Sequence, residues 1–283
     1  MPLYRAAASQ FRAQVLDNSL TLVLVEQYGY QIGQRPSPGE VRAWERSLHV
    51  LSADLVQAGL DDVEVLVEHQ LPLTSKRADV VLCGVHPTTG EPSYVVVELK
   101  QWSDAHLLED STELCSVPGS GGTRLHPAEQ VRRYCGHLED FLATLEDLRD
   151  PLAGVAYLHN ATDLSVADLF DLPEDAFGRL FTGQRRGQFL DYLQTRLAPG
   201  VRGAEAADRL LGSAVRPSRQ LLALAAEEVQ TREVFRLQAE QQVAYSLVLR
   251  ALERSRRGAH KQAVVVVGGP GSGKSVIALS LLG

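Results

Sequence analysis

Two stretches decide the fold: residues 77–82 read Arg-Ala-Asp-Val-Val-Leu, and residues 95–100 read Val-Val-Val-Glu-Leu-Lys. Both contain short β-branched runs, and such runs bounded by Pro, Thr and Gly are typical of buried strands. Residues two apart on a strand point to the same face of the sheet. Glu98 and Lys100 are therefore expected to project together, while Leu99 points into the core.

A helix is signalled before these strands. Ser37 at the N-cap, Pro38 at the first helical position and Glu40 form a capping box. The apolar stripe that follows recurs every three or four residues and stops at Gly59, as expected of one helix that packs on a core. Its members are Val41, Trp44, Leu48, Leu51 and Leu55.

The remaining pattern predicts an α/β protein. Residues 103–126 are expected to form an irregular, partly helical insertion with a mobile loop at 118–122, and a helix is expected from about Pro127. Residues 188–254 are mainly helical by pattern, with a break near Pro217. The predicted strands are 63–67, 78–85, 93–99, 154–158 and, less strongly signalled, Leu180-Phe181.

These elements predict two domains. Residues 1–200 are expected to form a mixed sheet flanked by helices. Residues 201–283 are expected to contain a mainly helical connector and then a strand, a glycine-rich loop and a helix. The boundary is placed near residue 200, where Ala198-Pro199-Gly200 interrupts the helical pattern.

The charged residues of the first block predict a metal site. Asp79, on the strand next to Glu98, is expected to join the Glu98 and Lys100 side chains. Two carboxylates and the Leu99 carbonyl make an oxygen-only pocket of the kind that suits Mg²⁺ or Mn²⁺. Such an ion activates water and neutralises phosphate, while a lysine ammonium can orient the water or stabilise the developing charge.

This arrangement resembles the PD-(D/E)xK nuclease superfamily, although Ala78 stands where the motif has Pro. Gln130 and Tyr134 match the Q-x-x-x-Y signature of its RecB-like branch and share one helix face. The resemblance implies a restriction-endonuclease-like fold and roles in cleavage for Asp79, Glu98, Lys100, Gln130 and Tyr134. Many members also place a glutamate of the first core helix near the metal. Glu45 is the candidate for that position, and Glu68 is the alternative.

A second motif follows the connector. Residues 268–275 read Gly-Gly-Pro-Gly-Ser-Gly-Lys-Ser, which fits the P-loop pattern, and they lie between the apolar run 263–267 and the apolar run 276–282. In a P-loop, glycines turn main-chain N–H groups toward phosphate oxygens. Lys274 is expected to reach the phosphates of ATP, and the Ser275 hydroxyl is expected to bind Mg²⁺. The glycines of the loop include Gly268, Gly271 and Gly273.

Residues 235–242, upstream of the loop, resemble the L-x-x-x-Q element with which superfamily 1 helicases contact adenine, and Gln241 is the matching glutamine. Taken end to end, the chain resembles the bacterial Schlafen-group-3-like DNA/RNA helicases. This resemblance implies a RecA-like motor domain that begins near the P-loop. It also implies a role in nucleic-acid processing or in defence against phage, with DNA favoured over RNA as the substrate.

Composition restricts the remaining possibilities. The 283 residues carry a formal net charge of −7, so basic residues must act locally if nucleic acid is the partner. The candidate basic groups are Arg132 with Arg133, Arg185 with Arg186, and the arginines and lysine of 254–261. No apolar run is long enough to span a bilayer, and no secretory signal is present, so we expect a cytoplasmic protein. Homo-oligomerisation and a protein partner stay open.

The cysteines and histidines give no support to other sites. Three cysteines without C-x-x-C spacing predict reduced thiols in or near the core. The histidines His106, His126, His137 and His159 lack the spacing of a zinc hydrolase.

Three functional readings follow. The first is an active metal-dependent nuclease coupled to a motor, which the intact Asp79, Glu98 and Lys100 favour. The second is a catalytically inactive nuclease fold that serves as the nucleic-acid-binding module of an ATP-dependent helicase. The third is a nucleotide-binding switch with an unrelated partner domain. Because the motor elements beyond the P-loop helix are not in this sequence, we expect it to bind nucleotide weakly and not to hydrolyse ATP.

Overall fold

The computed structural model describes residues 1–109, 111–219, 221, 239–257, 263–269 and 272–282. They fall into two compact units, Met1–Arg216 and Pro217–Gly283. The division lies later than the position near residue 200 expected from the sequence, because helix α6 (Ala204–Leu211) packs on strands β3 and β4 of the first unit. Each unit is described by itself below.

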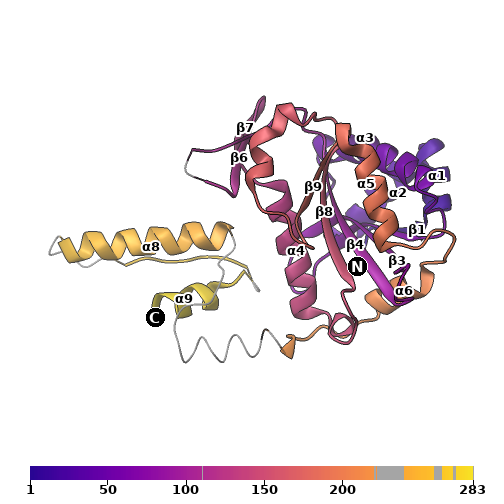
Figure 1. Cartoon of the computed structure of the whole chain (residues 1–283). Coiled ribbons are helices and arrows are strands. Elements are labelled where there is room, and N and C mark those ends of the chain that lie inside the picture. The colour runs from indigo at the N-terminus through magenta and orange to yellow at the C-terminus, as the bar shows by residue number, and fades with distance from the viewer. Residues whose placement is uncertain (110, 220, 222–238, 258–262, 270–271, 283) are drawn as a thin grey trace. The chain divides into compact units, whose positions relative to one another are not determined.

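A six-stranded mixed sheet forms the centre of the first unit, with helices on both faces (Figure 1). Its order is β1-β2-β3-β4-β8-β9, in which β1 to β4 pair antiparallel and β4, β8 and β9 pair parallel. The strands are β1 (Tyr4–Ala7), β2 (Glu64–Gln70), β3 (Arg77–Val85), β4 (Pro92–Lys100), β8 (Leu152–Leu158) and β9 (Arg179–Thr182). The strands predicted within residues 63–181 are therefore confirmed.

The helices of the first unit cover the two faces of this sheet. Helix α3 begins with the predicted capping box, in which the Ser37 side chain accepts from Glu40 N–H and the Glu40 side chain accepts from Ser37 N–H. The α-helices are α1 (Ala8–Leu16), α2 (Ser19–Ile32), α3 (Pro38–Gln57), α4 (Pro127–Phe141), α5 (Arg186–Arg196) and α6. The short 3-10 helices are η1 (Ala143–Leu145), η2 (Leu164–Asp171) and η3 (Gly183–Arg185).

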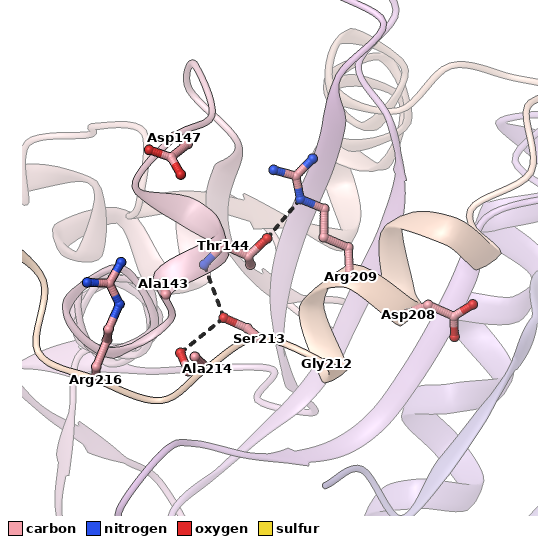
Figure 2. A pocket seen from close by; sticks show the side chains of 9 residues that line it. All are labelled: Ala143, Thr144, Asp147, Asp208, Arg209, Gly212, Ser213, Ala214 and Arg216. Carbon is pink, nitrogen blue, oxygen red and sulfur yellow. Dashed lines mark hydrogen bonds between the residues drawn. The ribbon is translucent and has the colours of Figure 1, made fainter.

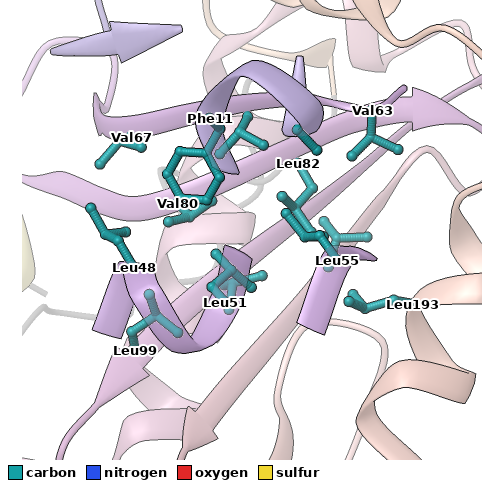
Figure 3. Packing of buried hydrophobic residues seen from close by; sticks show 14 of the residues in the cluster. Phe11, Leu48, Leu51, Leu55, Val63, Val67, Val80, Leu82, Leu99 and Leu193 are labelled. Atoms are coloured by element: carbon teal, nitrogen blue, oxygen red, sulfur yellow. The ribbon is translucent and has the colours of Figure 1, made fainter. Parts of the chain in front are cut away.

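Strand β4 is buried on both faces because each face meets its own hydrophobic cluster. Val95, Val97 and Leu99 belong to the cluster formed with α1, α2, α3 and α5, part of which Figure 3 shows. Tyr94 and Val96 belong to the cluster formed with α4, α6 and η2. A strand flanked in this way reads as a nearly continuous apolar run, which explains the sequence before Glu98.

The expectation for residues 103–126 was wrong. They form a small antiparallel sheet of β5 (His106–Leu107), β6 (Leu114–Val117) and β7 (Ser120–Leu125) instead of a partly helical insertion. The glycines at 119 and 122, which suggested a mobile loop, adopt positive φ angles at the turn between β6 and β7 and just after it. Such φ angles are open to glycine without steric cost.

The second unit contains helices α8 (Ala239–Arg257) and α9 (Lys274–Leu282). The predicted helix after the P-loop is confirmed, but the predicted strand 263–267 is not a strand in the structure. A parallel strand needs a neighbour to pair with, and the described residues of this unit supply none. Of the helices in the described ranges, none combines the length and the hydropathy that a bilayer-spanning helix requires.

Candidate active site

Strands β3 and β4 separate where the predicted carboxylates lie. Their main-chain pairing runs from Val85 opposite Pro92 to Val80 opposite Val97, which places Asp79 and Glu98 just beyond the paired segment. There the Asp79 carboxylate accepts a hydrogen bond of 2.8 Å from the Leu99 N–H. The Asp79 side chain of β3 thus bonds the main chain of β4 and holds Asp79 and Glu98 at the point where the two strands separate.

Glu98 lies at the centre of a polar cluster. Its side chain is buried, with only 2 % of the residue exposed. The Lys100 ammonium donates to Glu98 Oε1 at 2.6 Å, and the Gln130 amide donates to the same oxygen at 2.7 Å. The second oxygen, Oε2, is buried and has no hydrogen-bond partner within the described part of the chain.

Helix α4 adds the two residues of the Q-x-x-x-Y motif to this cluster. The Gln130 amide nitrogen that donates to Glu98 also donates to the Tyr134 hydroxyl oxygen at 2.9 Å. Because Tyr134 accepts this bond, its own hydroxyl hydrogen is free to bond another group. The structure therefore brings together Asp79, Glu98, Lys100, Gln130 and Tyr134, which come from two strands and a helix.

The start of α4 is fixed by His126, which is fully buried. Its Nδ1 accepts from Ala128 N–H at 3.1 Å, and its Nε2 lies 2.9 Å from the Leu169 carbonyl oxygen. Both ring nitrogens are satisfied only in the neutral tautomer that carries hydrogen on Nε2. His126 therefore lies outside the carboxylate cluster and caps the helix that supplies Gln130 to it.

The acids of the cluster resist ionisation. Burial and, after it, the neighbouring Asp79 raise the pKa of Glu98 to about 8 against the opposing effect of Lys100. Burial also raises the pKa of Asp79. For Lys100, burial acts to lower the pKa, but the Glu98 and Asp79 carboxylates outweigh it and hold the pKa above the ordinary value of a lysine. Lys100 therefore stays charged at neutral pH.

A further acid, Glu68, belongs to the same electrostatic cluster. It lies on β2 between Val67, which pairs with Val80 of β3, and His69, which pairs with Ala78, and it has a φ angle of 52°. Its carboxylate accepts from the Trp44 indole N–H at 2.8 Å. Burial and the Asp79 carboxylate raise the pKa of Glu68 to about 7.

Glu45, the other acid predicted for this position, is exposed on α3. Among the described contacts, none joins it to Asp79 or Glu98. The sequence offered Glu68 only as the alternative to Glu45, because nothing in its local sequence distinguishes it from Glu64 four residues earlier.

The cluster fits a small divalent cation by two observations. The unpartnered Glu98 Oε2 is a buried oxygen that needs a positive or donating group once the carboxyl group is ionised. Burial and the carboxylates of Asp79 and Glu68 raise the pKa of Glu98, and the ammonium of Lys100 opposes them. The described residues contain no group of three or more His, Cys, Asp or Glu side chains placed around one ion. The predicted set, two carboxylates and the Leu99 carbonyl, is smaller and relies on water to complete the shell.

The basic groups expected to meet nucleic acid are engaged with acids of the same chain. Arg132 and Arg133 both pair with Glu129. Arg185 pairs with Asp163, and Arg186 pairs with the buried Asp54. The side chains of Arg254, Arg256, Arg257 and Lys261 lie outside the described residues. The prediction of reduced thiols is confirmed, since Cys83, Cys115 and Cys135 are free and buried.

A hollow of about 440 Å³ lies elsewhere in the first unit, between η1, α6 and the segment that follows α6 (Figure 2). Arg209 crosses it and donates to the Thr144 hydroxyl at 2.9 Å. Helix α6 lies beside the start of β4, where the Tyr94 hydroxyl donates to the Ala206 carbonyl. Glu98 and Lys100 lie at the other end of that strand. The lining contains none of the predicted site residues.

In the second unit, the ammonium of Lys274 bonds to carbonyl groups of its own P-loop. Lys274 Nζ donates to the carbonyl oxygens of Gly268 at 2.6 Å and Gly269 at 2.7 Å, and the Gln241 amide donates to the Ser272 carbonyl at 3.1 Å. Gly273 has a φ of +78°, which favours glycine, and a Cβ there would lie 2.0 Å from the Gln241 amide nitrogen, so a larger residue would also require the Gln241 side chain to move. Gly271, the side chain of Ser275 and residues 235–238 of the L-x-x-x-Q element lie outside the described residues.

Comparison of the chain with known protein families, with curated proteins and with solved structures found no match.

Proposed function

We propose that this protein is a divalent-metal-dependent nuclease that hydrolyses phosphodiester bonds of DNA or RNA, with DNA favoured. The observation that carries the proposal is the bond from the Gln130 amide to Glu98 Oε1, which connects the Q-x-x-x-Y helix to the E-x-K strand. Two motifs that are 32 residues apart share one carboxylate oxygen. This supports a PD-(D/E)xK-like fold with a RecB-like site.

Asp79, Glu98 and the Leu99 carbonyl would hold the cation. When bound, Mg²⁺ or Mn²⁺ supplies the positive charge that activates water and neutralises a phosphate. Asp79 accepts the Leu99 N–H and thereby fixes the main chain beside Glu98. Gln130 orients Glu98 through the oxygen that it shares with Lys100.

Lys100 and Tyr134 would act on the substrate itself. Lys100 keeps its proton because the Glu98 and Asp79 carboxylates raise its pKa, so it serves as a cation toward charge that develops on the phosphate. Burial raises the pKa of Tyr134, so its hydroxyl stays neutral and donates a hydrogen bond to a phosphate oxygen or a base.

The second unit is proposed to bind a nucleoside triphosphate through its P-loop. Lys274 already lies against the loop carbonyls, and a phosphate would offer its ammonium a stronger acceptor. Gln241, which bonds the loop, is proposed to read the base. Together the two units support a nuclease-helicase similar to the Schlafen-group-3-like helicases, acting in nucleic-acid processing or defence against phage.

Cleavage of labelled single- and double-stranded DNA and RNA in Mg²⁺, Mn²⁺ or EDTA tests the nuclease proposal. Glu98→Gln and Lys100→Ala should each lower the rate about a hundredfold or more, since loss of a metal ligand or of a charge that stabilises the transition state typically costs several kcal/mol of barrier. Both variants should keep the circular dichroism spectrum of the wild type.

Wild-type protein that binds these nucleic acids but leaves them uncut would indicate the alternative function, an inactive nuclease fold that serves as a binding module. Cleavage that persists in both variants would show that the site has been assigned to the wrong residues.

A further inference from the structure

A closed ring of hydrogen bonds lies one residue beyond Lys100, at the ends of β4 and β8. Gln101 Nε2 donates to Ser47 Oγ at 3.2 Å, and Ser47 Oγ lies 3.0 Å from His159 Nε2. His159 Nδ1 lies 3.1 Å from Asn160 Oδ1, and Asn160 Nδ2 donates to the Gln101 main-chain carbonyl at 3.1 Å. The ring joins helix α3 to two neighbouring parallel strands.

The chemistry of these groups fixes the direction of every bond. An amide oxygen only accepts, so the bond to Asn160 places hydrogen on His159 Nδ1. The neutral imidazole then accepts at Nε2, and the Ser47 hydroxyl donates to it. Burial lowers the pKa of His159, which favours this neutral form. Each side chain of the ring is thereby held in one orientation.

The ring holds the end of the strand that carries Glu98 and Lys100. The pairing of β4 with β8 ends at Lys100 opposite Leu158, so Gln101 and His159 are the first residues beyond it. Gln101 also donates to the Ala43 carbonyl of α3 at 3.1 Å. Without these bonds the main chain after Lys100 would lose its connections to α3 and to the end of β8.

We propose that Ser47, Gln101 and His159 are positioning residues that fix the Lys100 ammonium against Glu98 for catalysis. This inference rests on the proposed nuclease function. A nucleophile, a histidine and a third residue that orients the histidine also occur together in hydrolases with a serine or cysteine nucleophile. Ser47, however, lies within α3, is only 5 % exposed, and accepts from Gln101 while it donates to His159. These features favour positioning over nucleophilic attack.

Single-turnover and steady-state cleavage by the full chain in Mg²⁺ tests the proposal. Ser47→Ala and Gln101→Ala should lower kcat by about tenfold to a hundredfold with little change in KM, because small misplacements of catalytic groups have effects of this size. Ser47→Thr keeps the hydroxyl and should restore most of the rate. Ser52→Ala is the matched control, since Ser52 is also buried on α3 but donates only to the His49 carbonyl of its own helix.

The outcomes separate this inference from the nuclease proposal. Wild-type protein without cleavage overturns both. Active wild type with Ser47→Ala and Gln101→Ala as fast as Ser52→Ala overturns the positioning role alone, as does covalent labelling of Ser47 by a fluorophosphonate, which would make it a nucleophile. If Ser47→Ala does not fold, the cleavage rate of Gln101→Ala tests the positioning role, because Gln101 is half-buried at the end of the strand and its substitution is expected to leave the fold intact.

Discussion

At the scale of single residues, Glu98 combines deep burial with a repulsive neighbour. Its pKa is about 8 in the folded protein, against 4.5 as the ordinary value of a glutamate. Between these two pH values the folded state binds a proton that the unfolded state has released. The contribution of Glu98 to stability is therefore complete below pH 4.5 and is lost as the pH rises toward 8.

The raised pKa of Glu98 predicts how the pH dependence of stability changes in Glu98→Gln when no metal is present. In EDTA, wild-type stability should decline between about pH 5 and 8, and the decline should be smaller in the variant, by on the order of a few kcal/mol, since one pKa unit corresponds to about 1.4 kcal/mol. Urea denaturation at several pH values measures both slopes. Equal slopes in the two proteins would mean that Glu98 ionises normally.

Glu68 and Glu45 are the two candidates for the additional glutamate near the cation. Glu68 interacts with Asp79 and Glu98, whereas Glu45 is exposed. We expect Glu68→Gln to lower metal-dependent cleavage at least tenfold by removing charge from the cation site, and Glu45→Gln to have the smaller effect. Titration of Mg²⁺ against the cleavage rate of each variant measures this. A larger effect of Glu45→Gln would instead assign the glutamate near the cation to helix α3.

The sequence suggested the five clustered residues through the resemblance to the PD-(D/E)xK pattern, and strand and helix periodicity place Glu98 with Lys100 and Gln130 with Tyr134 on common faces. It offered Glu68 only as the alternative to Glu45 and could not choose between them, and it could not predict the ring around His159. Both depend on which strands are neighbours and in what register, and such long-range pairing leaves no local pattern in the sequence.

At the scale of elements, the position of α4 depends on its N-cap. His126 satisfies the Ala128 N–H and bonds the Leu169 carbonyl of η2, so one side chain sets both the start of the helix and its attachment. Burial lowers the pKa of His126 below 6.5. The folded state therefore resists protonation, and the stability that His126 contributes is complete above pH 6.5 and is lost as the pH falls below it.

Accordingly, His126→Ala should lower the free energy of unfolding by about 1 to 3 kcal/mol at pH 7.5, through loss of the cap and of a buried hydrogen bond. His126→Asn, which keeps a capping oxygen, should lose less. The difference between wild type and His126→Ala should shrink at pH 5. Chemical denaturation at the two pH values measures these effects, and a difference that grows in acid would contradict the assigned tautomer.

Local sequence was a sound guide to the long elements and a poor one to two short regions. The capping box and apolar stripe predicted α3 because both signals are local. The small sheet β5-β6-β7 was missed because its strands have two to six residues. The run 263–267 was predicted as a strand from its valines, but strand formation requires a pairing partner as well as propensity.

At the scale of the whole molecule, the two proposed chemistries belong to separate units. Both hydrophobic clusters and every residue of the carboxylate site lie within Met1–Arg216. We expect residues 1–216 alone to keep the metal-dependent cleavage rate of the full chain. Lys274→Ala in the full chain should weaken binding of Mg-ATP about tenfold or more, through loss of a charged hydrogen-bond donor, and leave cleavage unchanged.

Calorimetric titration with Mg-ATP and the cleavage assay measure these two properties independently. A fragment 1–216 that folds but does not cleave would show that the second unit contributes to the nuclease site.

The internal pairing of the arginines has a consequence for how a substrate arrives. With a net charge of −7, and with Arg132, Arg133, Arg185 and Arg186 bonded to acids of their own chain, these arginines of the first unit offer a nucleic acid little long-range attraction. Encounter should then proceed at the unsteered rate of about 10⁵ to 10⁷ M⁻¹ s⁻¹, and added monovalent salt should screen repulsion as much as attraction. Selection of a substrate would then occur after contact, at the site of Asp79 and Glu98 where β3 and β4 separate.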